Sequence, residues 1–228
     1  LVNRLGNEAP RMLLCLHEEH AVSIAHGWAK VTGEPMAVIL HSNVGLMHGT
    51  MAIFNAWCDR LPMLLFGATG PVDAALRRPW IDWLHTSRDQ GALIRNYVKW
   101  DDQPASVEAG IEAMLRANLL ARTPPHGPCY VNFDVSVQER RLDAMPDLPD
   151  PARYRPPRPP EPAAADIAEA GRLLRDAASP LILAGRVSRR CEDWARRVAL
   201  AEALGATVLT DIKVAAAFPT DHPLHKGI

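Results

Sequence analysis

The sequence lacks an excess of charge of either sign. Its 25 Lys and Arg residues stand against 26 Asp and Glu residues, which leaves a formal net charge of -1. Proteins that hold nucleic acid or an anionic membrane surface carry a basic field, so we expect neither partner. The chain also has no apolar run near the roughly 18 residues that cross a bilayer, and residues 1–10 lack the basic start and apolar core of a signal peptide.

Cysteine is scarce and scattered. Cys15, Cys58, Cys129 and Cys191 lie far apart, and no two have the two-residue spacing of a zinc clip. Such usage excludes a disulfide framework and is typical of buried, reduced thiols. We therefore expect a reducing compartment and a cytoplasmic location.

Proline is the one residue type in excess, and its distribution divides the chain. Hydrophobic residues make up 48% and charged residues 22%, which is ordinary for a globular protein, but eight of the 20 prolines fall between Pro146 and Pro162. Such a density forbids helix and favours extended polyproline geometry. We interpret residues 145–162 as a linker between domains at 1–144 and 163–228. A recognition segment for an SH3-like partner is the alternative.

Short apolar runs alternate with helical periodicity along the whole chain. The pattern predicts strands at 11–16, 36–40, 63–66 and 129–133 and helices at 18–30, 46–59 and 107–121 before the linker. After the linker it predicts helices at 164–177 and 191–204 with strands at 181–183 and 207–210. Continuous apolar strands separated by helices indicate an α/β fold with a parallel, doubly wound sheet. Two strands after the linker cannot bury a sheet on both faces, so we expect a truncated second α/β domain.

Two segments hold polar side chains where a parallel sheet binds ligands, just beyond the carboxyl ends of strands. They are 17–20 (HEEH) and 41–49 (HSNVGLMHG). His17 and His20 are three residues apart, whereas zinc-protease helices need four, so we assign no metal ligand. A phosphate cradle at 45–49 lacks the glycine and lysine pattern of known loops. From the residues alone, the favoured role of Glu18 is structural: a carboxylate in the first turn of a helix, stabilised by the positive end of the helix dipole.

The order of motifs in the whole chain resembles one enzyme family. Residues 16–30 (LHEEHAVSIAHGWAK) and 32–35 (TGEP) are similar to the signature of thiamine diphosphate-dependent enzymes of the acetolactate synthase and benzoylformate decarboxylase type. Further similar segments follow in the same order: 40–42 (LHS) with Gly45, 55–57 (NAW) with Pro62, 98–100 (VKW), 104–106 (PAS), 128–131 (PCYV), 179–185 (SPLILAG) and 218–223 (FPTDHP).

The resemblance implies an architecture and a set of cofactors. Residues 1–144 would be a pyrimidine-binding domain without its first strand, and residues 163–228 part of a central domain. Thiamine diphosphate is the implied cofactor. The Mg²⁺ ligands would lie in a third, pyrophosphate-binding domain, because Gly-Asp-Gly does not occur in this sequence. FAD would accompany some members, and a homodimer or homotetramer is the implied assembly.

The resemblance also assigns roles to four residues. The family's glutamate falls on Glu18, whose carboxyl group would hydrogen-bond ring nitrogen N1′ of the cofactor, and partial burial would raise its pKa. His41 would stand near the reacting carbonyl as a proton donor or acceptor, or else cap the following helix. Gly45 would permit close approach of the pyrimidine. His48 occupies a cofactor-binding position where relatives often have asparagine.

These roles imply a thiamine diphosphate-dependent 2-oxo acid decarboxylase or carboligase, similar to benzoylformate decarboxylase and acting on a small 2-oxo acid. Acetolactate synthase is the alternative within the family. A non-catalytic nucleotide-binding or regulatory α/β module, or a scaffold for oligomers, is the alternative outside it. The stretch 80–85 (WIDWLH) could line a pocket, form a subunit interface, or simply pack.

Overall fold

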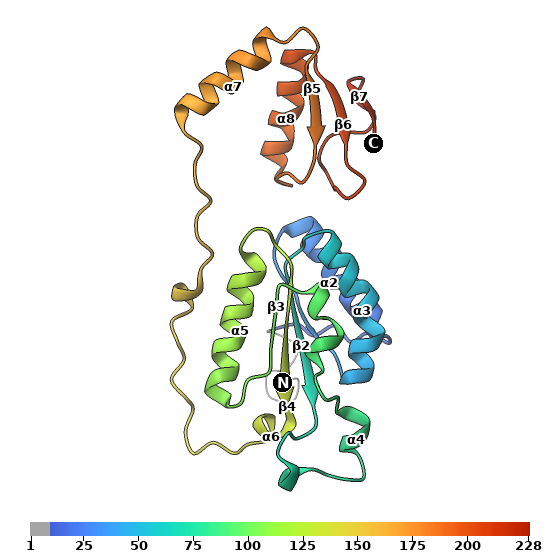
Figure 1. Cartoon of the computed structure of the whole chain (residues 1–228), viewed down its shortest axis with the longest axis vertical. Helices are drawn as coiled ribbons and strands as arrows, with labels where there is room; N and C mark the ends of the chain where they lie inside the picture. Colours follow the sequence, from blue (N-terminus) through green and yellow to red (C-terminus); the bar gives the residue numbers. More distant parts are fainter. Residues whose placement is uncertain (1–9) are drawn as a thin grey trace. The chain divides into compact units, whose positions relative to one another are not determined.

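The computed structural model describes residues 10–228. The expectation that residues 1–10 are not a signal peptide concerns residues 1–9, which lie outside the described range, and residue 10. The chain divides into two compact units, Leu1–Pro156 and Pro157–Ile228 (Figure 1). This division falls inside the predicted linker at 145–162, while the exact domain boundaries stay predictions.

The first unit is built on a four-stranded parallel sheet. Its strands are β1 (Ala37–Ile39), β2 (Met63–Thr69), β3 (Trp100–Asp102) and β4 (Pro128–Asp134), in the order β1-β2-β4-β3. The longest pairing runs from Met63 beside Pro128 to Thr69 beside Asp134. Every pairing is parallel, which confirms the predicted doubly wound α/β fold. The carboxyl ends of β2 and β4 thus lie side by side.

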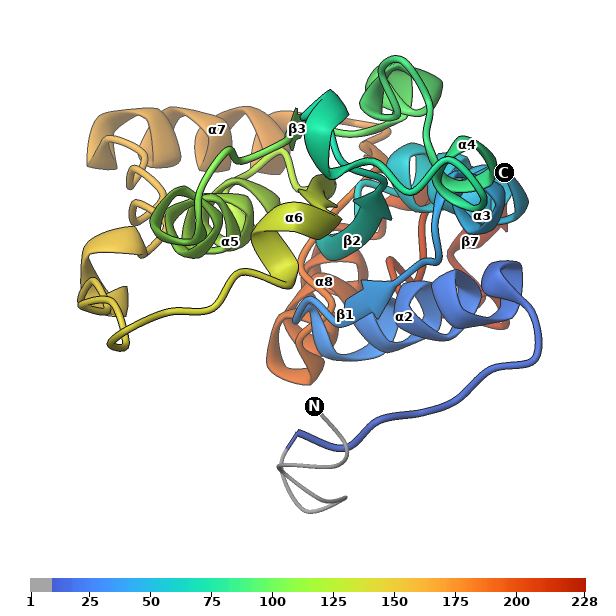
Figure 2. The same cartoon turned by 90° about the horizontal axis from the view of Figure 1, so that it is seen from below.

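Helices cover both faces of this sheet. Helices α2 (Glu18–Thr32) and α3 (Asn43–Cys58) lie on one face and α5 (Val107–Arg122) on the other (Figures 1 and 2). Side chains of β4 alternate between the two cores: Tyr130 packs with α2 and α3, whereas Cys129 and Val131 pack against Ala113 and its neighbours on α5. Both cores are apolar, as expected for a sheet covered on both faces.

The two helices nearest the polar segments have clear sequence signals. His17 caps α2 by accepting the N–H of Glu19 at 3.2 Å, and Gly33, at φ 77°, ends that helix in the left-handed region that glycine favours. Helix α3 begins at Asn43, three residues before its predicted start. Gly45 therefore lies in the first turn of a helix, not in the loop before it.

Short elements fill the connections of the first unit. They are the helices α4 (Asp82–His85) and α6 (Val135–Gln138) and the 3-10 turns Ala74–Leu76, Gly91–Leu93, Arg95–Tyr97 and Pro151–Tyr154. These elements are too short for a helical period, which explains why the sequence pattern did not indicate them.

The second unit is a smaller parallel sheet with two helices. It contains α7 (Ala164–Asp176), β5 (Leu181–Ala184), α8 (Cys191–Leu204), β6 (Thr207–Thr210) and β7 (His225–Gly227), with strand order β5-β6-β7. The expectation of only two strands is wrong, because β7 adds a third. Its three residues include a histidine, a lysine and a glycine, so no apolar run marked it. Leu181 and Leu183 on β5 remain 53% and 72% exposed.

Two further expectations from the sequence are wrong. Residues 11–16 form no strand: Leu14 and Leu16 are almost fully exposed, and no described strand pairs with this segment. An apolar run becomes a strand only when a neighbour satisfies its backbone groups. All four cysteines lie within residues 10–228 and none forms a disulfide there, but Cys191 is exposed and only Cys129 is fully buried.

A nearly buried carboxylate ties α2 to the end of α3. Oδ2 of Asp59 accepts a hydrogen bond from Nζ of Lys30 at 2.7 Å and lies 2.9 Å from Nε2 of His26. Burial by itself would raise the pKa of Asp59, but the bonds from Lys30 and then His26 outweigh it and lower the pKa below its ordinary value. The pair of helices that carries the polar segments is thereby held together.

We expect Asp59→Asn to lower the free energy of unfolding by about 1–2 kcal/mol at pH 7, because it removes a charge-assisted pair that Lys30 and His26 share. Since the pKa of Asp59 is lower in the folded than in the unfolded chain, the stabilisation is complete above the unfolded value and is lost as the pH falls through the folded one. Urea denaturation at pH 7 and at about pH 3, below the roughly 3.9 of an unfolded aspartate, measures both effects.

Glu34→Gln is the matched control for this prediction. Glu34 pairs with Arg122 on the surface, where both side chains are well exposed, and such pairs contribute little. Equal losses in the two variants, or a loss at Asp59 that does not shrink in acid, would contradict the assignment.

Candidate functional site

Glu18 stands at the start of α2 against a glycine of α3. A Cβ placed on Gly45 would lie 3.1 Å from Cγ and 3.2 Å from Oε1 of Glu18. Cβ atoms rarely come so close to a neighbour, so the missing side chain is what lets this carboxylate lie against α3. The Glu18 side chain is 32% exposed, and its oxygens can therefore reach a ligand. The structure brings together two of the residues that the sequence singled out.

His48 completes the contact from the next turn of α3. Its Nδ1 lies 3.2 Å from Oε2 of Glu18, and its ring stacks on that of His17 with centroids 5.0 Å apart. The neighbouring Glu19 takes part only through its backbone N–H, which His17 accepts. The geometry thus distinguishes Glu18, whose carboxylate meets α3, from its neighbour Glu19.

The predicted pKa shift of Glu18 is wrong in direction. Its own backbone N–H, free at the first turn of α2, hydrogen-bonds the carboxylate and lowers the pKa; the hydrogen bond from His48 adds to this, and burial opposes it only weakly. The carboxylate lies at the surface of this chain, so burial cannot dominate. Glu18 is ionised at neutral pH.

His41 lies in a second part of the same region. Its ring stands edge-on to that of His85 with centroids 4.9 Å apart, and Oγ of the buried Ser42 is 3.2 Å from Nδ1 of His85. These three residues line a cavity of about 250 Å³ at the carboxyl ends of β1 and β2, and its other lining residues are Ala68, Thr69, Gly70, Arg78, Trp80, Ile81, Asp82 and Val135.

One segment joins this cavity to the Glu18 contact. This segment is residues 41–48. Its first two residues, His41 and Ser42, line the cavity, whereas Gly45 and His48 contact Glu18. Trp80 lines the cavity yet is 75% exposed, and Trp83 is 70% exposed. The sequence left three interpretations of the 80–85 stretch: a pocket lining, a subunit interface or simple packing. The first fits Trp80.

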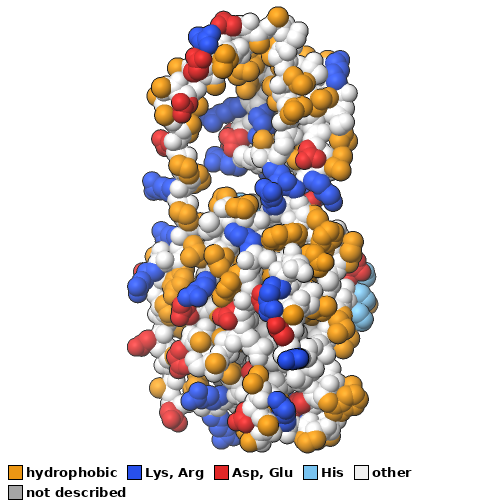
Figure 3. Space-filling model, in the orientation of Figure 1, with side chains coloured by type: hydrophobic (Ala, Val, Ile, Leu, Met, Phe, Trp, Pro, Cys, Tyr) orange, Lys and Arg blue, Asp and Glu red, His pale blue; other side chains and the backbone are white. Residues whose placement is uncertain are grey.

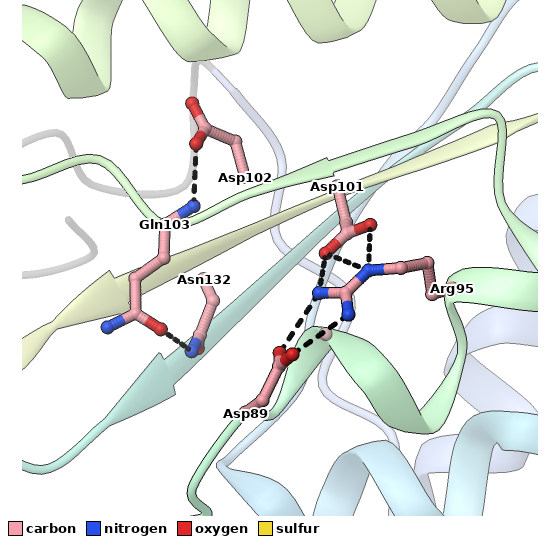
Figure 4. A pocket seen from close by; sticks show the side chains of 7 residues that line it. Asp89, Arg95, Asp101, Asp102, Gln103 and Asn132 are labelled. Carbon is pink, nitrogen blue, oxygen red and sulfur yellow. Dashed lines mark hydrogen bonds and ion pairs between the residues drawn. The ribbon is translucent and has the colours of Figure 1, made fainter.

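A polar cavity of about 310 Å³ lies near the ends of β3 and β4 (Figure 4). Within it, the Arg95 guanidinium lies between two carboxylates, 2.8 Å from Oδ2 of Asp89 and 2.7 Å from Oδ2 of Asp101. Asp101 and then Asp89 raise the pKa of Arg95, which in turn lowers that of Asp89. Nδ2 of Asn132 donates to Oε1 of Gln103 at 3.0 Å. The charges of Arg95, Asp89 and Asp101 are therefore paired with one another.

The sequence did not single out His17 or the Arg95 bridge as site residues, and it indicated His85 only as the last residue of the 80–85 stretch. His17 was visible only as half of a spacing that fits no metal motif, and the contact of His85 with His41 joins residues of different connections. Arg95 follows Asp89 by six residues, a spacing with no helical meaning. Charge pairing across two turns of irregular chain leaves no periodic signal.

Comparison with known proteins identifies the first unit. Residues 1–93 match the family model described as the thiamine pyrophosphate enzyme, N-terminal TPP binding domain. The benzoylformate decarboxylase of Pseudomonas aeruginosa is 27% identical over 96% of this chain and 40% of its own length. The acetolactate synthase large subunit of Corynebacterium glutamicum is 30% identical over 96% of this chain and 34% of its own length.

The solved structures agree in fold. The thiamine diphosphate-dependent 4-hydroxybenzoylformate decarboxylase of Rhodococcus jostii superposes with a TM-score of 0.74 at 25% identity, over 96% of this chain and 40% of that one. The chain thus spans well under half the length of these relatives. No helix among residues 10–228 is long and apolar enough to cross a membrane. Motif order, parallel fold and family model agree, and residues 1–93 belong to the family of N-terminal TPP-binding domains of thiamine pyrophosphate enzymes.

Proposed function

We propose that this chain supplies the pyrimidine-binding side of a 2-oxo acid decarboxylase or carboligase, similar to benzoylformate decarboxylase. The observation that carries the proposal is the contact of Glu18 with Gly45. A carboxylate that rests on a bare Cα, with part of its surface exposed, can accept or share a proton with an aromatic ring nitrogen. A module that only bound a nucleotide would not need a carboxyl group there.

The residues around Glu18 fit thiamine diphosphate. Glu18 and Gly45 would hold its pyrimidine ring, and His48 would keep the carboxylate oriented through the 3.2 Å contact. When bound, this cofactor supplies the electron sink that takes up the negative charge left when carbon dioxide departs. The lowered pKa of Glu18 means that the carboxyl group can take the shared proton only when a ligand covers it and reduces its solvation.

The cavity beside His41 suits the acid substrate. Ring nitrogens of His41 and His85 and the hydroxyl of Ser42 can hydrogen-bond a carbonyl or carboxylate, while Trp80 and Ile81 offer apolar surface to a side chain. We propose that His41 moves a proton to or from the substrate carbonyl oxygen. The relatives named benzoylformate and 4-hydroxybenzoylformate decarboxylase support an aromatic 2-oxo acid.

Acetolactate synthase is the second candidate, because the Corynebacterium relative is 30% identical. FAD in the purified protein would favour it. The Mg²⁺ ligands would lie outside these residues in either case, since the sequence has no Gly-Asp-Gly. A homodimer or homotetramer and a cytoplasmic location stay predictions.

The test uses the complete polypeptide that contains these residues. We expect carbon dioxide release from benzoylformate to require thiamine diphosphate and Mg²⁺, with an aldehyde as product. Pyruvate converted to acetolactate at a higher kcat/KM would favour the second candidate instead. Absence of both thiamine diphosphate binding and 2-oxo acid turnover would overturn the proposal in favour of a regulatory module.

A further inference from the structure

Two imidazoles and a carboxylate meet at the start of α2. One ligand atom from each of His17, Glu18 and His48 lies within 4.8 Å of the other two. The space-filling view has histidine side chains gathered at the edge of the first unit on the side of α2 and α3 (Figure 3). The sequence could not indicate this cluster, because 30 residues separate Glu18 from His48.

One edge of the cluster already has the length that a metal ion needs. Zn²⁺ binds imidazole nitrogen and carboxylate oxygen at about 2.0–2.2 Å, which places two ligand atoms of a tetrahedron roughly 3.3 Å apart. Nδ1 of His48 and Oε2 of Glu18 are 3.2 Å apart. The same distance fits a hydrogen bond from the Nδ1–H tautomer of His48 to the carboxylate, and a metal ion would take the place of that proton.

The third ligand requires a small adjustment. His17 is half-buried, and its ring lies nearly parallel to that of His48, at 12°. Its Nδ1 accepts the N–H of Glu19, so coordination through His17 competes with this cap. We therefore expect His17 to be the weakest of the three ligands. The His48 side chain is 52% exposed and can rotate without disturbing the core.

The charge balance allows a cation at this place. The positive end of α2 opposes one, but two carboxyl groups, those of Glu18 and Glu19, lie in the first turn of that helix and offset it. Imidazole with carboxylate is a ligand set that suits Zn²⁺ and its neighbours in the first transition row better than Mg²⁺ or Ca²⁺.

We propose that His17, Glu18 and His48 form a binding site for one divalent transition-metal ion such as Zn²⁺, with water in the remaining position. This departs from the sequence-based expectation of no metal ligand in the chain. One consequence depends on the proposed function. The same carboxylate cannot hold both a metal ion and the pyrimidine of the cofactor, so metal and thiamine diphosphate compete.

The first experiment measures metal binding without cofactor. The complete polypeptide, untagged and treated with chelator, is titrated with Co²⁺, followed by its visible absorption, and with Zn²⁺ by calorimetry. We expect His48→Gln and Glu18→Gln each to weaken one site by at least the roughly 10–100-fold that disturbing a metal ligand's outer partner costs. Far-ultraviolet circular dichroism checks that both variants are folded.

Glu202→Gln provides the matched control. Glu202 also pairs with a histidine, His222, at 3.3 Å, but the described residues contain no third ligand beside them. We expect this variant to bind metal as the unchanged protein does. Equal metal affinity in the unchanged protein, His48→Gln and Glu18→Gln would overturn the site, as would equal losses in Glu18→Gln and Glu202→Gln.

The second experiment adds thiamine diphosphate to the metal-loaded protein. A rise in the apparent Kd for Zn²⁺ supports competition at Glu18. Metal that binds through His48 and Glu18 but is not displaced by bound cofactor refutes competition and leaves the metal site standing. If no cofactor binds at all, the proposed function fails, while the first experiment still decides the metal site.

Discussion

Gly67→Ala is expected to be the most destabilising single-atom change in the first unit. Gly67 is a buried residue of β2, and a Cβ there would overlap the hydroxyl of Tyr130 and lie 2.7 Å from Cζ of that ring. Tyr130 cannot move away, because its side chain is fully buried and its hydroxyl accepts from Gln90 and donates to Asn132.

We expect a loss of about 3–4 kcal/mol in the free energy of unfolding, from overpacking together with a broken pair of buried hydrogen bonds. At roughly 2–4 °C per kcal/mol for a chain of this size, Tm should fall by about 10 °C. Calorimetry of the purified variant measures the shift.

Gly27→Ala is the companion variant with the opposite expected sign. Gly27 lies inside α2 and exposed, and nothing lies within 4 Å of the position its Cβ would take. Alanine should stabilise the helix by about 0.5–1 kcal/mol. If both variants shifted Tm in the same direction, the close packing of Tyr130 on Gly67 would not be the cause.

Glu18→Gln has the largest expected effect on activity and rests on the proposed function. Glutamine keeps the shape of the side chain but cannot share a proton with a ring nitrogen, so we expect kcat/KM for the 2-oxo acid to fall about 10²–10⁴-fold. The assay follows carbon dioxide release by the complete polypeptide with saturating thiamine diphosphate and Mg²⁺.

Glu19→Gln controls for the loss of a charge at the same helix end. The Glu19 side chain is exposed, and only its backbone N–H enters the cap of α2, so its activity should stay within a few-fold of the unchanged protein. A Glu18→Gln variant that retained more than a tenth of the activity would remove Glu18 from the catalytic step.

Elements with a strong local signal were predictable from the sequence. Helix α2 has a polar cap and a terminal glycine, and β2 and β4 are apolar runs between turns, so their positions were correct to within a few residues. The resemblance to a known signature also placed Glu18 and Gly45 in one site, and the structure has them in contact.

What the sequence missed depends on contacts between distant segments. The stacking of His17 on His48 follows from the way α2 packs on α3, and the three residues of β3 form a strand only because β4 lies beside them. The apolar run at 11–16 shows the reverse case, because no strand among the described residues pairs with it. The pKa of Glu18 was misjudged because burial was assumed for a side chain that lies at the surface.

The pairing of β2 with β4 also means that, during synthesis, β2 stays unpaired on one side until β4 has been made. Residues Met63–Thr69 lie in the middle of the sheet, yet their neighbours on one side are Pro128–Asp134. At about 5–20 residues per second, a ribosome needs roughly 3–12 s to make residues 70–127, which separate the two strands. For an interval of this length, the apolar run 63–66 has left the ribosomal exit tunnel but cannot yet pair with β4. A pause in translation after β2 has left the tunnel and before β4 has been made would therefore leave an unpaired apolar strand exposed, where chaperones can bind it.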